Sequence, residues 1–217
     1  MMDWKSYNKE RKRRFCNLHL LKDINFVNGE MPALEPYTGE VPTDFIPFNQ
    51  AIKSKDYDKC VHFFIDDYQF ERVWSNPERY IPLLKRFKCV IAPDFSVFLD
   101  VPDYVNCWNV YRNRLLAQYM QQQGVKIIPN IQVVPDNVKK YVFSGLENCD
   151  LVAISSVQAN EYYNRLNWLN FTREAIEELA PKRLLVYGNK ITLSSHNNVT
   201  YIDNDNIKRL RLCKTNN

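Results

Sequence analysis

The residues Cys60-Val-His-Phe-Phe-Ile65 decide the fold class, because they form a short apolar run, rich in aromatic and β-branched side chains, that two aspartates follow at once. Similar short runs recur along the chain at Cys89–Ala92, Val125–Ile128, Leu151–Ile154, Leu184–Tyr187 and, more weakly, Val199–Ile202. Such runs are typical of strands that are buried on both faces of a sheet. The sequence therefore predicts five or six buried strands.

Helix signals separate these runs. Asn76 can cap a helix that begins at Pro77 and that Pro82 limits or kinks. Asp100 and Asp103 can cap a longer helix that ends at Gly124. Thr172 and Glu174 begin a short helix that stops before Pro181. The distance from one apolar run to the next is too long for hairpins and suits βαβ crossovers. We therefore expect an α/β fold with a mostly parallel sheet, either open or curled into a partial barrel.

The first part of the chain has a different character. Glycines and prolines break up regular structure after a basic helical stretch in residues 1–44. We expect this segment to be an arm that packs along the domain, and residues 45–217 to form a single α/β domain. A length of 217 residues suits one compact domain.

The net positive charge of the chain comes from its first 14 residues. Residues 1–14 hold six basic and two acidic side chains, and the rest of the chain balances at 23 of each. A nucleic-acid-binding domain usually carries a basic face of its own. The basic cluster Arg11, Lys12, Arg13 and Arg14 is a candidate for contacts with nucleic-acid phosphates, with a solvated helix start as the alternative.

Several function classes find no support in the sequence. The five glycines are too scattered for a glycine-rich phosphate loop, and the six cysteines lack zinc-ligand spacing. No Ser-His-Asp order or nucleophile elbow is present, and His62 lies inside an apolar run, where a structural role is expected. No signal peptide or membrane span is predicted, so a soluble, cytoplasmic protein with reduced cysteines is expected.

Polar side chains follow the predicted strands at the edge where parallel sheets bind ligands. They are Asp66, Asp67 and Tyr68 after the first strand, Asp94 and Ser96 after the second, Asn130 and Gln132 after the third, Ser155 and Ser156 after the fourth, and Asn189, next to Gly188, after the fifth. Carboxylates from neighbouring strands can meet on one ligand, so Asp67 and Asp94 are the main catalytic candidates. Asp66 is a weaker one, because side chains alternate along a strand.

Two kinds of chemistry suit this pair of carboxylates. Asp67 and Asp94 can hold Mg²⁺ or Mn²⁺ together with substrate phosphates, or divide into a general acid and a general base. Asx turns and helix caps are the structural alternative for aspartates in such positions.

An arginine interrupts the apolar face of the helix predicted to end at Gly124. Arg112 lies within this face and Asn109 at its border, whereas Arg114 falls on the opposite side and is expected in solvent. Buried arginines need partners, so Arg112 is expected to pair with Asp94 or Asp67, or else to reach solvent at the helix end. Arg112, Asn109, Asn130, Ser96 and Tyr68 are therefore the ligand-binding candidates.

Aromatic residues alternate with a cation in the stretch Tyr68–Trp74. This arrangement can stack on nucleic-acid bases, although a loop that packs its aromatic rings on the core would have the same composition.

Eight stretches together resemble a known family: Ile46–Asn49, Ala51–Lys55, Val61–Trp74, Asn76–Tyr80, Pro93–Ser96, Trp108-Asn109, Tyr111–Arg114 and Ile128–Asn130. It is a family of uncharacterised proteins, a domain of unknown function common in bacteriophages, plasmids and other bacterial mobile elements. The resemblance covers residues 45–190 and is most specific between 46 and 130. It implies a mobile-element setting and assigns no reaction, cofactor or catalytic residue.

The chain departs from the family pattern at two places. Relatives follow the third-strand Pro-Asn with a polar segment containing Arg, Trp and Asp, where this chain has Ile131–Pro135. After the fourth strand they tend to carry His-Gly, where this chain has Ser156-Val157-Gln158. If those groups complete an active site in relatives, this protein binds the same ligand class without turning it over.

Two functions follow as hypotheses. The first is a phage or mobile-element accessory protein that binds or processes a nucleotide or nucleic acid at a carboxylate-lined crevice. The alternative is a non-catalytic protein that contacts nucleic acid or a host protein in replication or counter-defence.

Overall fold

The computed structural model describes residues 15–193 and 196–204. Its centre is a pair of four-stranded parallel sheets, with strand orders β3-β4-β5-β6 and β7-β8-β9-β10. The strands are β3 (Phe45–Pro47), β4 (Cys60–His62), β5 (Cys89–Ile91), β6 (Ile127–Ile128), β7 (Asn130–Ile131), β8 (Leu151–Ser155), β9 (Arg183–Tyr187) and β10 (Val199–Ile202). The predicted α/β class with parallel strands is confirmed, although the described residues form eight parallel strands rather than five or six.

One short stretch of chain serves both sheets. Ile127 and Ile128 of β6 pair with β5, and after Pro129 the two residues of β7 pair with β8. The carbonyl of Ile128 accepts the N–H of Ala92, and the carbonyl of Pro129 accepts the N–H of Ala153, each at 2.8 Å. The two sheets therefore follow one another in sequence order around Pro129.

The sheets curl toward each other into a partial barrel. The rings of His62 on β4 and Tyr187 on β9 lie 4.6 Å apart between centroids, although these strands belong to different sheets. The residues that fill the inside are Tyr37, Cys60, Cys89, Ile91, Ile128, Leu151, Ala153, Leu185, Tyr187 and Ile202. Within the described residues β3 and β10 each pair on one side only, so the barrel stays open between them.

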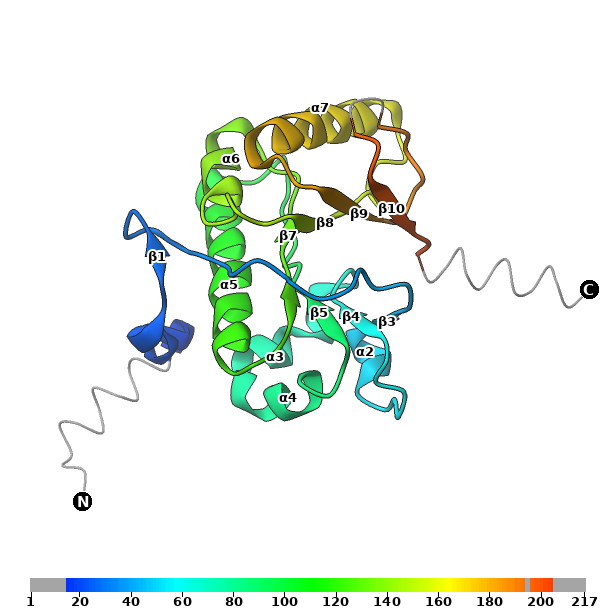
Figure 1. Cartoon of the computed structure of the whole chain (residues 1–217). Coiled ribbons are helices and arrows are strands. Elements are labelled where there is room, and N and C mark those ends of the chain that lie inside the picture. The colour runs from blue at the N-terminus through cyan, green and yellow to red at the C-terminus, as the bar shows by residue number, and fades with distance from the viewer. Residues whose placement is uncertain (1–14, 194–195, 205–217) are drawn as a thin grey trace, which may run out of the picture.

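Helices cover the outer side of the curled sheets (Figure 1). They are η1 (Phe15–Asp23), α2 (Phe48–Ala51), η2 (Asp67–Gln69), α3 (Glu71–Ser75), α4 (Pro77–Leu84), α5 (Asp103–Gln122), α6 (Asp136–Phe143) and α7 (Tyr162–Leu179). None of the described helices is both long enough and apolar enough to cross a membrane. The predicted starts at Pro77 and Asp103 are confirmed, as is the stop of α5 before Gly124, whose φ of +84° suits glycine.

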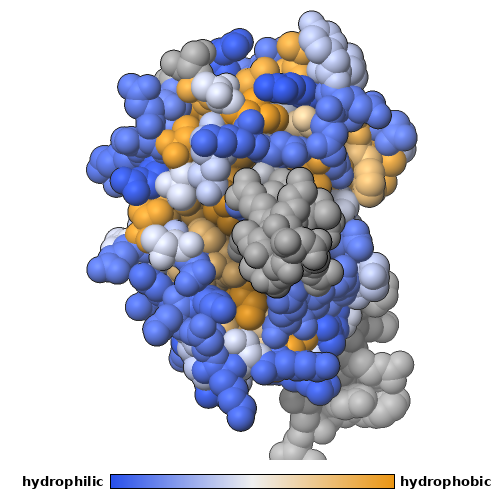
Figure 2. Space-filling view, turned by 90° about the vertical axis from the view of Figure 1, so that its right-hand side faces the viewer, coloured by the Kyte–Doolittle hydropathy of each residue, from blue (hydrophilic) through white to orange (hydrophobic). Residues whose placement is uncertain are grey.

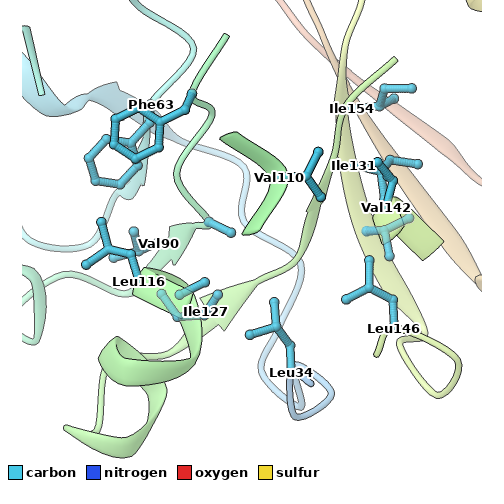
Figure 3. Packing of buried hydrophobic residues seen from close by; sticks show 14 of the residues in the cluster. Leu34, Phe63, Val90, Val110, Leu116, Ile127, Ile131, Val142, Leu146 and Ile154 are labelled. Carbon is cyan, nitrogen blue, oxygen red and sulfur yellow. The ribbon is translucent and has the colours of Figure 1, made fainter. Parts of the chain in front are cut away.

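The main core lies between the strands and the helices, on the opposite side of the sheets from the barrel interior. Figure 3 shows one group of core side chains that includes Val90 and Ile127, and another that includes Ile131 and Ile154. Val110 of α5 lies between the two groups. Helix α5 therefore packs against both sheets and joins their cores.

Helix α7 is much longer than the predicted short helix that begins at Thr172, so that prediction is wrong. Asparagines at 164, 167 and 170 weaken the intrinsic helix propensity of its first half. The apolar residues Trp168, Phe171, Ala175 and Leu179 nevertheless form one buried face, and their burial outweighs the local propensity.

The segment before β3 packs along α5. It contains η1 and a two-stranded antiparallel sheet of β1 (Phe26–Val27) and β2 (Met31–Pro32). The amide of Gln118 accepts the N–H of Asn25 at 2.8 Å and donates to the carbonyls of Asn25 and Ala33. These bonds fasten the described part of the arm to the domain.

Candidate active site

A cavity of about 430 Å³ opens at the carboxyl ends of β4, β5, β7 and β8. This is the edge at which parallel α/β folds place their ligands. The residues that line it are Phe64, Ile65, Asp66, Asp94, Ser96, Val97, Phe98, Leu99, Asp100, Ile131, Gln132, Val133, Ser155, Val157, Gln158, Ala159, Asn164, Asn167 and Trp168. Loops of both sheets and the first turns of α7 therefore build one site.

Asp94 is the central ionisable group of this cavity. It follows β5, and its Oδ1 accepts a hydrogen bond of 2.7 Å from the Nδ2 of Asn130, the first residue of β7. Burial is the main cause that raises the pKa of Asp94 to about 7, and the hydrogen bond from Asn130 opposes this rise. The negative charge of Asp67 raises the pKa further, and the Gln132 amide lowers it. Asp94 therefore exchanges its proton near neutral pH.

Two amides beside Asp94 keep unused hydrogen-bonding capacity. Gln132 is 6% exposed and lines the cavity. Its Nε2 makes no hydrogen bond of good geometry among the described residues, although the amide lies near enough to Asp94 to lower the pKa of that carboxyl. The Oδ1 of Asn130 is buried and likewise lacks a partner there. Buried polar atoms without partners are uncommon and costly, so a ligand that bonds to Gln132 is favoured.

Asp67 fastens the loop that forms one wall of the cavity. Its carboxylate accepts the backbone N–H of Ser96 at 3.1 Å and the Ser96 hydroxyl at 2.8 Å. The carbonyl of Ser96 in turn accepts a hydrogen bond of 2.5 Å from Asn109 of α5. Ser96 lines the cavity and Asp67 does not, so Asp67 acts on the site through Ser96.

Arg112 supports this wall from α5. Its Nη1 donates to both carboxylate oxygens of Glu71 at 3.1 Å, and its Nη2 lies 3.8 Å from Asp67. The guanidinium also stacks over the ring of Phe95 at 3.5 Å, and its Nε donates to Asn109. The expected pairing with Asp67 is confirmed, whereas the stronger partner is Glu71 and not Asp94.

Arg114 is buried, which contradicts the prediction that it lies in solvent. It is 3% exposed and donates to the carbonyls of Val142 at 2.6 Å and Ser144 at 3.2 Å, at the end of α6. Burial lowers the pKa of Arg114 to about 10. The face opposite the apolar stripe of α5 is covered by α6, a helix that the sequence analysis did not predict.

The remaining candidates lie in different surroundings. Asp66 lines the cavity and is exposed, and Tyr68 is 79% exposed and is not part of the lining. His62 is buried inside the barrel, and Arg11, Lys12, Arg13 and Arg14 lie outside the described residues. The expected Mg²⁺ or Mn²⁺ site at Asp67 and Asp94 stays a prediction; the described residues contain no group of three or more His, Cys, Asp or Glu side chains placed to hold a metal.

The cavity is also lined by four amides that were not among the ligand-binding candidates, namely Gln132, Gln158, Asn164 and Asn167. Gln132 was recognised as a residue that follows the third predicted strand, and the same rule could have found Gln158 after β8. Asn164 and Asn167 lie in α7, whose first half was not predicted to be helical, and no local signal marks them.

Large hydrophobic side chains are exposed around the same end of the strands. Apart from Leu18, they lie in segments that follow β4, β5 and β8: Tyr68, Phe98, Leu99, Tyr104, Val105, Trp108, Tyr162, Tyr163 and Leu166. Figure 2 shows hydrophobic residues exposed near the middle and in the upper part of one face of the molecule, among hydrophilic ones. Exposed aromatic groups of this kind mark contact surfaces.

Residues 26–205 match the family described as Domain of unknown function (DUF4417). The chain belongs to this family. The match includes all described strands and every residue that lines the cavity, so the candidate active site lies wholly within the DUF4417 domain. The resemblance noted in the sequence is thereby confirmed.

Relatives of this DUF4417 protein occur in bacteriophages. The chain is 34% identical over 157 residues to the Gene 1 protein of Mycobacterium phage L5, which is 68% of each chain. It is 33% identical over 166 residues to the Gene 1 protein of Mycobacterium phage D29, which is 73% of this chain but only 60% of the relative. No solved structure matches the chain.

The two segments at which the sequence analysis expects a departure from the family pattern both line the cavity. Ile131, Gln132 and Val133 form part of the wall after β7, and Val157 and Gln158 form part of the wall after β8. These two walls present amide and apolar groups to the cavity.

Proposed function

We propose that this DUF4417 protein is a phage or mobile-element accessory protein that binds and processes a nucleotide or nucleic acid in the cavity, with Asp94 as general acid or base. One observation carries the proposal: the partly buried Asp94 carboxyl lines the cavity at the end of β5, and desolvation raises its pKa to about 7. A carboxyl group with a pKa near the working pH is suited to proton transfer.

The surroundings of Asp94 suit a positioned catalytic group. The hydrogen bond from Asn130 fixes one oxygen of the carboxyl and thereby the orientation of the other. Ser96 and Gln132 line the same cavity and can bind a ligand beside it. The Asp67–Ser96 bonds and the Arg112–Glu71 pair hold the wall in place, as a preorganised site requires.

The ligand class is supported by the setting of the relatives. The two Gene 1 proteins are encoded by mycobacteriophages. A mobile-element setting favours nucleotides and nucleic acids as ligands, and this support is by association rather than by chemistry.

A ligand screen with one catalytic variant tests the proposal. The full chain, Asp94→Asn and the control Asp150→Asn would be offered single- and double-stranded DNA, RNA and free nucleotides, with and without Mg²⁺ or Mn²⁺. Asp150 lies just before β8, at the opposite end of the strands, in an exposed pair with Lys182. Thermal stabilisation and turnover would both be scored.

We expect at least one of these ligands to stabilise the wild type and the Asp150→Asn control and to be turned over by both. Asp94→Asn should keep the fold and lose turnover. An Asp94→Asn protein that keeps every activity of the wild type would contradict the proposed role of Asp94.

A second candidate function is favoured by the exposed aromatic side chains around the cavity. Tyr104 is 88% exposed, and Tyr162 and Tyr163 are 79% and 70% exposed. Such rings stack on bases or pack against a protein partner. On this alternative the protein contacts nucleic acid or a host protein without catalysis, and the basic cluster of Arg11–Arg14 supplies phosphate contacts.

Two variants separate this alternative from the enzyme. Tyr104→Ser with Tyr162→Ser should weaken partner binding while turnover of a small ligand in the cavity is kept. Replacing Arg11, Lys12, Arg13 and Arg14 by alanine should lower both the affinity for nucleic acid and the dependence of that affinity on salt. Unchanged affinity in both variants would exclude this surface and this cluster as the contacts.

A further inference from the structure

We infer that the cavity takes the base and sugar of its ligand and keeps phosphate groups outside, so that the moiety it selects is an uncharged nucleobase or nucleoside. This inference rests on the proposed function and specifies which part of a nucleotide or nucleic acid reaches Asp94.

The charge of the cavity lining opposes a phosphate. Asp66, Asp94 and Asp100 line the cavity, and none of the described lining residues is Lys, Arg or His. Proteins bind phosphates through arginine, lysine, helix N-termini or bound cations. The side chains in this cavity instead repel an anion and accept hydrogen bonds from a neutral or cationic group.

The helix ends near the cavity do not replace the missing cations. Helix α7 supplies Asn164, Asn167 and Trp168 to the lining, and Glu161 stands at its N-cap. Helix α5, which follows the loop of Ser96 to Asp100, has Asp103 in its first turn. Neither carboxylate makes a capping hydrogen bond, but both place negative charge at the helix starts, so a phosphate there would meet like charge.

Arg112 does not provide a phosphate site either. Two of its nitrogens contact Glu71 and Asp67, a third donates to Asn109, and its flat face covers Phe95. It is not among the residues that line the cavity. The charge of Arg112 is therefore already paired with carboxylates that support the Ser96 wall of the cavity.

The polar groups of the cavity match the edge of a heterocyclic ring. The buried Nε2 of Gln132 lies near Asp94 but makes no hydrogen bond of good geometry among the described residues, so it can donate to a ring nitrogen or a carbonyl oxygen. Gln158, Asn164 and Asn167 each offer both a donor and an acceptor. The Asp94 carboxyl can accept from an exocyclic amine or, when protonated, donate to a ring nitrogen.

The apolar groups of the cavity match the faces of such a ring. Trp168 lines the cavity with its orientation fixed, because its Nε1–H donates to the carbonyl of Ser155 at 2.8 Å. Phe64, Ile131 and Val157 contribute further apolar surface. A volume of about 430 Å³ lies in the range of small-molecule sites.

Matched ligand pairs test the inference. Calorimetry in EDTA would compare adenosine, guanosine, cytidine and thymidine with their 5′-monophosphates on the full chain. We expect at least one nucleoside to bind, and its monophosphate to bind about tenfold more weakly or worse, because the added charge faces Asp66, Asp100 and the ionised fraction of Asp94. Asp66→Asn combined with Asp100→Asn should bring the two affinities closer together, and the control Asp150→Asn should leave their ratio unchanged.

The outcomes separate this inference from the proposed function. Monophosphates that bind as tightly as nucleosides or more tightly, in EDTA or after addition of Mg²⁺, would overturn the exclusion of phosphate and leave the proposed function intact. If neither nucleosides, nucleotides nor nucleic acids bind, both fail. A nucleoside preference that Asp66→Asn with Asp100→Asn does not reduce would overturn the electrostatic origin of that preference.

Discussion

The carboxylate of Asp67 holds Ser96 by two different groups, the backbone N–H at 3.1 Å and the hydroxyl at 2.8 Å. The two residues follow neighbouring strands, β4 and β5, and the bonds join their loops. Because Ser96 lines the cavity, this contact determines where one wall of the site stands. Several measurable consequences arise from it and from its neighbours.

Asp67→Asn is expected to destabilise the protein by about 1–3 kcal/mol, because hydrogen bonds to a charged acceptor are worth more than neutral ones. Ser96→Ala removes only the hydroxyl bond and should cost about 1 kcal/mol. Urea denaturation would give both values. The exposed control Asp150→Asn should change the free energy of unfolding by less than about 0.5 kcal/mol. A stability of Asp67→Asn equal to that of the wild type would refute the bracing role of this carboxylate.

Arg112→Met is expected to lower the free energy of unfolding by about 1–3 kcal/mol, since the side chain of Arg112 is 12% exposed and its loss removes the partner of Glu71 and a cation beside Asp67. The stability of Arg112→Lys should lie between those of Arg112→Met and the wild type, because an ammonium group keeps the charge but cannot make the bidentate contact with Glu71. A double-mutant cycle of Arg112→Met with Glu71→Gln should show a coupling of about 1 kcal/mol or more. If the free-energy changes of the two single variants simply add in the double variant, the Arg112–Glu71 pair contributes nothing to stability.

Stability should fall as the pH rises from about 4 to about 7 through the titration of Asp94. Its pKa in the folded protein is about 7, above the 3.8 of an ordinary aspartate, so the folded state holds the proton more tightly than the unfolded state. The resulting stabilisation is complete below the unfolded pKa and is lost as the pH passes the folded pKa, with an upper limit of about 4 kcal/mol.

Asp94→Asn removes this titration and serves as its control. The free energies of unfolding of wild type and Asp94→Asn would be measured by urea denaturation between about pH 4.5 and about pH 8.5, and their difference plotted, so that other titrating groups cancel. The variant should gain stability relative to the wild type as the pH rises. A difference that stays constant with pH would show that Asp94 titrates normally.

Arg114→Met is expected to destabilise the protein by about 2–4 kcal/mol, because it leaves the carbonyls of Val142 and Ser144 without their buried donor. Hydrogen exchange should localise the loss to α6 and to the α5–α6 contact, while the Asp67–Ser96 wall stays protected. Uniform loss of protection across the chain would indicate that Arg114 stabilises the whole domain rather than the end of α6.

The strands were predictable where the signal is local. The runs beginning at Cys60, Cys89 and Leu151 are buried strands, because a strand covered on both faces has to be apolar throughout. Strand β3 is short, contains Pro47 and lies in a segment full of turn residues, so only its non-local pairing with β4 identifies it. Strand β7 lies just beyond the predicted run Val125–Ile128, and it too is identified only by a partner far away in sequence, β8.

The position of the site was predictable and its contacts were not. Parallel topology places Asp66, Asp94 and Ser96 at the carboxyl edge of the sheet, independently of the contacts that their side chains make. Glu71 pairs with Arg112 across 41 residues because the start of α3 comes to lie beside α5, and no spacing rule expresses that. Arg114 was misplaced because its surroundings depend on α6, which the sequence analysis did not foresee.

The division of the lining between two sheets has a consequence for how this domain diversifies. The loops after β4 and β5 belong to one sheet and the loops after β7 and β8 to the other, and the chain passes from the first sheet to the second at Pro129. Natural variation can therefore reshape one flank and retain the opposite one, which carries Asp94, the proposed proton-transfer group. A lineage of such proteins can change what it recognises one half at a time, without rebuilding the fold.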